Sequence, residues 1–343
     1  MAPSGLGELA MRILVTGGSG FIGSNHIHHL LHARAGAPAA CCPDEARYAQ
    51  PHDLPDLRVL NMDKLTYAGD PANLKGVDGH RGYRHAKVDI CDAAGVDAAF
   101  KEFQPDAVVH FAAESHVDRS IEAGDVFVRS NVLGTQTLLD AARRHDTGQF
   151  LHVSTDEVYG SRATGSFTEA DGFHTASPYS ASKAGSDLLV LAHHATYGLR
   201  ATITRCTNNY GPRQHPEKLL PKVITLARKD QPLPIYGTGM NVRDWLYVKD
   251  HCAAIGRVLA LKDWGGVYNI GASDEKTNLE VVHAVLARLG KPESLITFVK
   301  DRPGHDWRYS LDSTKLRAKG WAPRTRFSEG LSDTIAWLRG SPA

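Results

Sequence analysis

Residues 13–25, with the sequence ILVTGGSGFIGSN, decide the fold of this chain. An apolar run predicts a strand, and Gly17, Gly20 and Gly23 follow it where a helix is expected to begin. Glycine adopts backbone torsions that other residues avoid, and the missing side chains let a pyrophosphate approach the amides at a helix N-terminus. The stretch therefore predicts a dinucleotide site, with a tight strand-to-helix turn that binds nothing as the alternative.

Apolar runs and helical patterns continue to alternate through the first half of the chain, which is typical of βαβ units. We predict an α/β fold with a Rossmann-type doubly wound parallel sheet. The expected strands are residues 12–16, 57–62, 84–88, 107–111, 149–154 and 201–205, and the expected helices are residues 22–33, 93–103, 125–145 and 179–197. Residues 35–55 are expected to form a surface insertion in the first crossover.

The pattern changes after residue 212. Helices are expected over residues 218–229, 250–261, 278–289 and 328–338, with short strands over 233–236, 267–270 and 296–299. We therefore predict a Rossmann domain over residues 11–205 and a smaller, mixed α/β ligand-binding part over residues 206–340, with some exchange of chain between the two.

Composition excludes several classes of protein. The chain has 343 residues and a net charge of +1, from 39 Lys and Arg against 38 Asp and Glu. This balance gives no reason to expect a nucleic-acid or membrane-surface partner, and no apolar run approaches the ~20 residues that span a bilayer. The five cysteines are scattered without a C-x-x-C pair, so we expect a reduced, cytoplasmic protein without a disulfide framework or zinc site.

Asp63 ends the second expected strand. A carboxylate at this place accepts hydrogen bonds from the adenosine ribose and repels a 2′-phosphate, which predicts NAD as the cofactor rather than NADP. Asp63 lies further from the glycines than the usual ~20 residues, and the insertion explains the difference. The alternative is an ordinary acidic residue at a strand end.

Two segments carry candidate catalytic residues. Thr155, Asp156 and Glu157 follow an expected strand, at the sheet edge where open α/β sheets form active sites. Tyr179 and Lys183 lie one turn apart on an expected helix. A lysine cation is expected to lower the tyrosine pKa, so that the phenolate accepts an alcohol proton while hydride leaves the same carbon. The alternatives are an ordinary amphipathic helix and a capping or solvated acidic pair.

These motifs resemble the extended short-chain dehydrogenase/reductase superfamily, and more narrowly the dTDP-glucose 4,6-dehydratase family. The resemblance covers about residues 11–338. It rests on the glycine loop, HFAA (110–113), the Tyr179/Lys183 pair, AESHVDRS (113–120), TDE (155–157), NNYGP (208–212), HPEKL (215–219) and RPGHD (302–306). The Asp-Glu pair is the most discriminating element, since 4-epimerases of the superfamily lack it.

The resemblance implies a lyase that oxidises a hexose nucleotide at C4, eliminates water between C5 and C6, and returns the hydride to C6. In this reading Glu157 is the base for the C5 proton, Asp156 is the acid for the C6 hydroxyl, and Thr155 hydrogen-bonds the C4 oxygen. The substrate would be dTDP-glucose, and the product a 4-keto-6-deoxy sugar nucleotide for deoxysugar or rhamnose biosynthesis. The choice between thymine and uracil stays open.

The resemblance also implies binding residues and a homodimer. Arg243 and Arg302 would pair with the diphosphate, although surface ion pairs are the alternative, and Tyr236 could equally be a packed strand residue. The dimer would form through a four-helix bundle of residues 125–145 and 179–197. The implied cofactor contacts are Gly17, Gly20, Phe21, Ile22, Gly23, Asp63, Lys64, Leu65, Thr66, Asp89, Ile90, Phe111, Ala112, Ala113, Ser130, Tyr179, Lys183 and Asn209. The implied substrate contacts are Ser115, Thr155, Asn208, Lys218, Leu219, Pro234, Ile235, Tyr236, Arg243, Asn278, Arg302 and His305.

Other functions stay open at this point: a sugar-nucleotide 4-epimerase or UDP-glucuronate decarboxylase of the same superfamily, or a nucleotide sensor that has lost catalysis. The intact catalytic set favours an enzyme, because a sensor has no need of it. The first helix carries His26, His28, His29 and His32. The 28/32 pair has metal-ligand spacing but no clear carboxylate or cysteine partner, so we expect a solvated helix face and no metal site.

Overall fold

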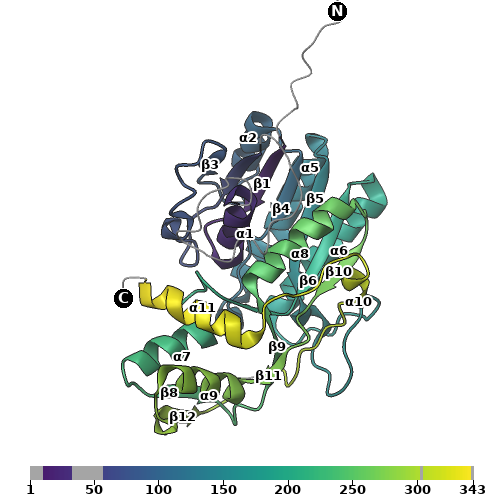
Figure 1. Ribbon diagram of the computed structural model, residues 1–343. Helices are drawn as coiled ribbons and strands as arrows, with labels where there is room; N and C mark the ends of the chain where they lie inside the picture. The colour runs from purple at the N-terminus through teal and green to yellow at the C-terminus, as the bar shows by residue number, and fades with distance from the viewer. Residues whose placement is uncertain (1–10, 33–56, 302–303, 341–343) are drawn as a thin grey trace, which may run out of the picture.

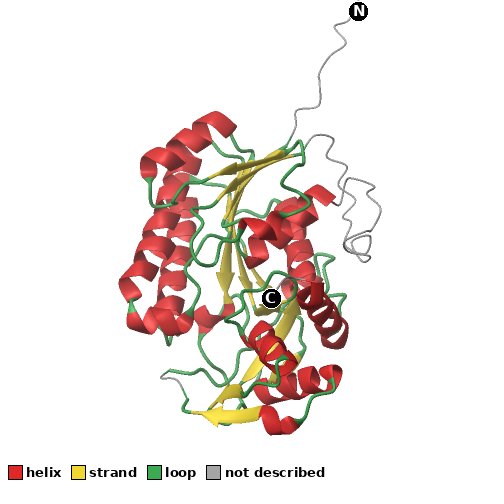
Figure 2. Ribbon diagram, turned by 90° about the vertical axis from the view of Figure 1, so that its left-hand side faces the viewer, coloured by secondary structure: helices red, strands yellow, loops and turns green. Residues whose placement is uncertain are grey.

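The computed structural model describes residues 11–32, 57–301 and 304–340. The predicted insertion at residues 35–55 and the predicted diphosphate ligand Arg302 lie outside these residues. A large twisted sheet with helices on both faces lies beside a smaller part built from short strands and helices (Figures 1 and 2). No helix of the described residues is long and apolar enough to cross a membrane.

Seven parallel strands form the large sheet, in the order β10-β6-β5-β4-β1-β2-β3. The order reverses between β1 and β4, the switch point at which open α/β sheets bind ligands. The predicted doubly wound sheet is therefore confirmed. The strands are β1 (Arg12–Thr16), β2 (Arg58–Met62), β3 (Tyr83–Ala86), β4 (Ala107–His110), β5 (Gln149–Thr155), β6 (Ala201–Cys206) and β10 (Val267–Ile270).

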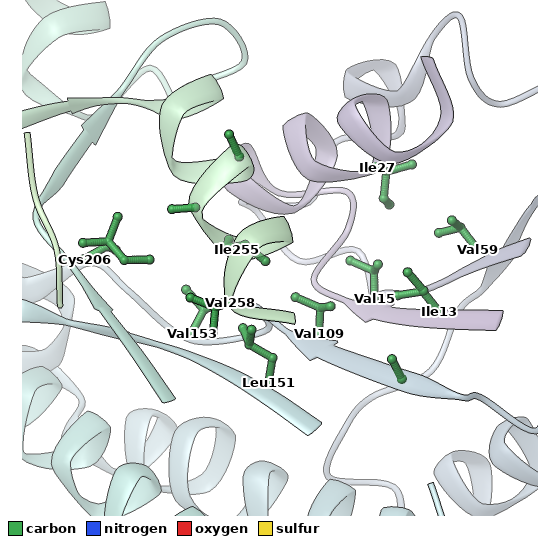
Figure 3. Close-up of a cluster of buried hydrophobic side chains, with 14 of the residues drawn as sticks. Ile13, Val15, Ile27, Val59, Val109, Leu151, Val153, Cys206, Ile255 and Val258 are labelled. Atoms are coloured by element: carbon green, nitrogen blue, oxygen red, sulfur yellow. The ribbon is translucent and has the colours of Figure 1, made fainter. Parts of the chain in front are cut away.

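Side chains that alternate along the strands build one core on each face of this sheet. Val15 and Val109 pack with Ile27 of α1 (Phe21–His32) and Val258 of α8 (Val248–Leu261), as Figure 3 shows. Leu14 points to the other face. There the core is completed by α2 (Ala93–Phe103), α5 (Gly134–Arg144) and α6 (Pro178–Tyr197). Burial on both faces explains why these strands are nearly continuous apolar runs.

The smaller part has a core of its own, which includes Tyr210, Trp245 and Phe327. A three-stranded sheet has the order β11 (Glu275–Thr277), β9 (Val242–Tyr247), β7 (Asn208–Tyr210), and β12 (Ile296–Val299) pairs with β8 (Leu233–Tyr236). Beside them lie α7 (Leu219–Arg228), α9 (Asn278–Leu289) and α11 (Phe327–Gly340). Shorter elements are η2 (Pro71–Leu74), α3 (Val117–Glu122), η4 (Asp156–Tyr159), η5 (Glu293–Leu295) and α10 (Thr314–Arg317).

Two arrangements differ from the sequence prediction. The helix expected over residues 125–145 is interrupted: α4 (Gly124–Phe127) leads into a π-helical segment, η3 (Val128–Leu133), before α5 begins. In addition, α8 and β10 come after the predicted boundary at residue 206 but belong to the large sheet and its covering layer, which is an exchange of chain of the kind expected between the two parts. The chain thus leaves the large sheet after β6, builds β7 to β9, returns to add α8 and β10, and then builds the rest of the smaller part.

Candidate active site

The carboxyl ends of the parallel strands meet at one edge of the sheet, and the predicted site residues follow them directly. Gly17 follows β1, Asp63 follows β2, Phe111 follows β4 and Asp156 follows β5. Segments that are far apart in the sequence are therefore brought together because every strand of this sheet points the same way.

The glycine loop turns so tightly that two of its glycines leave no room for a side chain. Gly17 has a positive φ of 67°, and a Cβ there would lie 2.7 Å from the Ala112 amide nitrogen. A Cβ on Gly23 would lie 2.3 Å from the Gly17 carbonyl oxygen. Gly20 is less crowded, with 3.2 Å from its would-be Cβ to that oxygen. The loop thus presents bare backbone at the start of α1, which fits an approaching pyrophosphate.

Asp63 holds the glycine loop and the turn after β2 together. Its Oδ2 accepts a hydrogen bond from the Ser19 amide at 2.9 Å, and its Oδ1 accepts one from the Leu65 amide at 2.8 Å. The side chain is buried. A carboxylate oxygen accepts two hydrogen bonds, so both oxygens retain capacity for ribose hydroxyls.

Most of the remaining predicted cofactor residues lie at this edge of the sheet, but the side chain of one of them does not. Lys64 and Asp89 are brought together, with 3.3 Å between Nζ and Oδ2, and Ser130 is buried on η3. The side chain of Ile90 is instead buried in the core, where it packs against Gly134. Only the backbone of Ile90 is therefore available to a ligand. Phe21 and Ile22 begin α1, and Thr66, Ala113 and Asn209 lie in or beside the loops that follow β2, β4 and β6.

Asp156 is a buried carboxyl beside a second carboxyl. Thr155 Oγ1 donates to Asp156 Oδ1 at 3.2 Å and accepts from the Glu157 amide at 3.3 Å, so Thr155 caps the short η4 turn. Asp156 is only 3% exposed. Burial raises the pKa of Asp156 well above its ordinary value, and neighbouring Glu157 raises it further. This environment favours the protonated form of Asp156 over the carboxylate.

Tyr179 and Lys183 lie on the first two turns of α6, which begins after a Ser177/Ser180 capping box. Lys183 Nζ donates to the Val153 carbonyl of β5 at 2.8 Å, and burial lowers the pKa of Lys183 to about 8. Burial and the negative charge of Glu157 raise the pKa of Tyr179, although a hydrogen bond with Thr155 acts in the opposite direction. The expected lowering of the tyrosine pKa by Lys183 is therefore wrong for this structure, because burial dominates.

Arg243, a predicted diphosphate ligand, is buried rather than part of a surface ion pair. Its guanidinium lies 4.1 Å above the ring of Tyr309 and donates to the carbonyls of Val242, Asp306 and Trp307. The positive charge also acts on Asp156, whose pKa it lowers against the effect of burial. Arg243 thus brings a cation from β9 to the carboxyl pair on the large sheet.

The other predicted substrate residues come from loops of the smaller part and from the segment after β4. Lys218 Nζ donates to the Ser115 carbonyl at 3.1 Å, while Asn208 lies on β7 and Leu219 begins α7. His305 contacts the edge of the Tyr236 ring, and Tyr236 is half exposed, so it is not a packed strand residue. Pro234 is half-buried on β8, and Asn278 begins α9. Ile235 is buried in the core, which leaves only its backbone available.

One cluster at this edge was not predicted. The Arg119 guanidinium lies 3.8 Å above the Tyr67 ring and donates to Glu217 at 2.7 Å. The contact joins the loop after β2, helix α3 and the segment before α7. Tyr67 follows the predicted residues 63–66 directly, and Arg119 and Glu217 lie within motifs quoted above, so their positions in the sequence could have identified them.

The histidines of α1 do not form the expected solvated face. His26 and His28 are buried, because α1 is enclosed by the sheet, η2 and α8. His28 is within 2.9 Å of the Asn73 carbonyl, whereas neither ring nitrogen of His26 has a hydrogen-bond partner among the described residues. Within the described ranges, no three metal-ligating side chains are grouped so as to hold an ion.

Known proteins are similar in sequence to this chain along nearly its whole length. Residues 53–334 match the family model for GDP-mannose 4,6 dehydratase. The dTDP-glucose 4,6-dehydratase of Streptomyces griseus is 48% identical over 96% of this chain and 94% of its own length, and that of Actinoplanes sp. is 46% identical over 96% and 98%. DesIV, a dTDP-glucose 4,6-dehydratase from Streptomyces venezuelae crystallised with NAD and TYD bound, has a TM-score of 0.87 and 47% identity, covering 96% of this chain and 97% of DesIV.

Proposed function

This chain belongs to the dTDP-glucose 4,6-dehydratase family, and from that premise we propose that it converts dTDP-glucose to dTDP-4-keto-6-deoxyglucose. The observation that carries the proposal is the placement of Asp156 and Glu157 beside Tyr179. A proton acceptor for an alcohol then lies next to an acid and a second carboxyl that can divide an elimination between them.

NAD fits the edge of the large sheet. The glycine loop, Asp63 and the residues after β4 would hold it, because the tight turn at Gly17 and Gly23 leaves backbone without side chains to face the pyrophosphate. When bound there, NAD would supply the hydride acceptor for C4 and the hydride donor for C6, and the positive charge of its oxidised ring would favour an ionised Tyr179. We assign NAD binding to the part built on this sheet and the sugar nucleotide to the smaller part.

Tyr179 accepts the proton of the C4 hydroxyl as that carbon is oxidised. Burial raises the pKa of Tyr179 in the protein alone, so the cofactor's positive charge, together with the Lys183 cation, would have to offset that burial before the phenolate forms. Thr155, already in contact with Tyr179, donates to the C4 oxygen. The new carbonyl at C4 makes the C5 proton acidic, since the resulting carbanion is an enolate. Every later step depends on this activation.

Two neighbouring carboxyls in different environments divide the elimination. Burial raises the pKa of Asp156 and so favours its protonated form, which donates a proton to the departing C6 hydroxyl, and this group leaves as water. Glu157 is less buried and removes the C5 proton. Their unequal burial supports this division, because the group kept neutral is the one that must supply a proton.

One assay tests both the reaction and the preference for the nucleotide base of the substrate. The protein is incubated with dTDP-glucose and then treated with alkali, in which the 4-keto-6-deoxy product absorbs near-ultraviolet light. Parallel reactions with UDP- and GDP-hexoses measure which nucleotide base the enzyme prefers in its substrate. Product from none of these hexose nucleotides would refute the dehydratase proposal, and a sugar epimerised at C4 would favour the epimerase instead.

Glu157→Gln separates oxidation from elimination. We expect this variant to reduce bound NAD, seen as NADH absorbance, but to form product at least a hundredfold more slowly, within the range of general acid–base catalysis. The matched control is Glu102→Gln at the exposed end of α2, which should turn over like the parent. Parental turnover by Glu157→Gln would overturn the assignment of the base.

A homodimer is the further part of the proposal. Large apolar side chains are exposed on two neighbouring helical segments: Val128 and Leu133 on η3, and Leu188 and Tyr197 on α6, with Val128 56% and Leu188 54% exposed. Exposed apolar side chains that gather on one face are typical of a protein–protein interface. Pairing of two such faces would make a four-helix bundle that hides them from water.

A further inference from the structure

Asp187 is a buried carboxyl that the mechanism above leaves without a role. It follows Tyr179 and Lys183 on α6 at intervals of four residues, so the three side chains lie along one face of the helix. Asp187 is completely buried, and its Oδ2 accepts a hydrogen bond from Arg205 Nε of β6 at 2.8 Å. Arg205 Nη1 continues the network to the Tyr159 hydroxyl at 2.7 Å.

The groups around Lys183 leave its charge without another nearby counter-ion. His110 of β4 and His152 of β5 face it, but burial lowers the pKa of both rings well below neutrality. Cys206 of β6 also faces it, and burial raises the pKa of this thiol to about 12. Arg205 adds a second cation to the same region, and burial raises the pKa of both Tyr179 and Asp156, which favours their neutral forms. Burial raises the pKa of Asp187 too, but the Arg205 and Lys183 cations and the hydrogen bond from Arg205 lower it, so Asp187 is the carboxyl of this group that is paired with a cation.

We propose that Asp187 is a positioning residue that acts through Lys183: its carboxylate, anchored by Arg205, keeps the buried lysine charged and directed toward Tyr179. Burial alone disfavours an ammonium group, so without a counter-charge Lys183 would lose its proton near neutral pH. This inference rests on the proposed function, because Lys183 has its role only in that reaction.

The test compares pH profiles of kcat/KM for Asp187→Asn and Arg205→Gln, measured by formation of the alkali-absorbing product. C4-deuterated dTDP-glucose checks that oxidation limits the rate. In Asp187→Asn the alkaline limb of the profile should move to lower pH by about one to two units, because the Lys183 ammonium loses the opposite charge that favours it. In Arg205→Gln the alkaline limb should stay at the same pH or move to higher pH, because removing the Arg205 cation removes a positive charge that disfavours the Lys183 ammonium.

If the Arg205–Asp187 pair is purely structural, both variants should lower kcat/KM by the same factor at every pH and leave the alkaline limb in place. That result would overturn the inference. Asp187→Glu, which keeps the charge, should restore the parental limb. Asp146→Asn makes the same substitution at an exposed aspartate and should change nothing. If Asp187→Asn does not fold, the double variant Asp187→Asn/Arg205→Gln removes both buried charges and should retain a lowered limb.

The two proposals fail in different ways. If the parent forms no product from dTDP-glucose or the other hexose nucleotides, the proposed function fails. If the parent is active and the alkaline limb of every folded Asp187 variant coincides with that of the parent, only the inference about Asp187 fails.

Discussion

Replacing His251 by leucine should make the protein markedly less sensitive to acid. His251 is completely buried on α8, neither ring nitrogen has a hydrogen-bond partner within the described residues, and burial lowers its pKa to about 3. The unfolded chain takes up a proton there near pH 6.5, whereas the folded protein does not. The free energy of unfolding therefore falls as pH falls below about 6.5, and the folded state regains protons only near pH 3.

The size of this effect follows from the two pKa values. One proton taken up only by the unfolded chain gives a slope of about 1.3 kcal/mol per pH unit, which amounts to about 2 kcal/mol between about pH 7 and pH 5. Urea unfolding of the NAD-loaded protein across this range measures it. Wild-type protein should lose about 2 kcal/mol more than His251→Leu, a large fraction of a typical total stability of about 5–15 kcal/mol.

A control on β3 guards against a general effect of removing a histidine. His85 is exposed, and His85→Leu should leave the pH dependence of wild-type protein unchanged. If wild type and His251→Leu lose the same free energy between about pH 7 and pH 5, then His251 is charged or hydrated in the folded protein and the reasoning is wrong.

Three further predictions concern the cofactor, the chemistry and the assembly. Tyr179→Phe should leave NAD bound but slow its reduction by dTDP-glucose by a factor of about 10² to 10⁴, measured as NADH absorbance; reduction at the parental rate would contradict the role of Tyr179. Gly23→Ala places a methyl group 2.3 Å from the Gly17 carbonyl oxygen, so it should lower stability by about 1–3 kcal/mol and release NAD on gel filtration. Gly79→Ala, which meets no atom within 4 Å, should do neither. Leu188→Asp should halve the mass measured by light scattering, and an unchanged dimer would exclude this face as the interface.

The sequence was informative where burial on both faces of the sheet requires apolar residues. Strands β1, β8, β10 and β12 and helices α2 and α9 match the expected bounds, because their apolar periodicity or caps are local signals. β7 (Asn208–Tyr210), β9 (Val242–Tyr247) and β11 (Glu275–Thr277) were not predicted. NNY and EKT are short and polar, and VRDWLY carries two adjacent charged residues that interrupt its apolar pattern, so these segments become strands through pairing with segments far apart in the chain.

The candidate site could be assembled from motifs, but the electrostatic environment of its residues could not. Spacing predicted that Tyr179 and Lys183 share a face of α6, whereas the raised pKa of Tyr179 depends on burial and on Glu157, which only the packed structure reveals. Similarly, the i, i+4 pattern of α1 gave no sign that His26 would be enclosed, because the covering helix α8 comes from more than 200 residues later in the sequence.

The return of the chain to the large sheet limits how this protein could be divided or recombined. A fragment that ends at Cys206 would lack β10 and α8, so β6 would become an edge strand with unpaired backbone groups, and Val15 and Val109 would lose the part of their cover that α8 provides. Such a fragment would aggregate rather than serve as a portable cofactor module. Chimaeras with relatives should therefore keep β6, α8 and β10 from one parent and exchange only the loops that border α7 and β12.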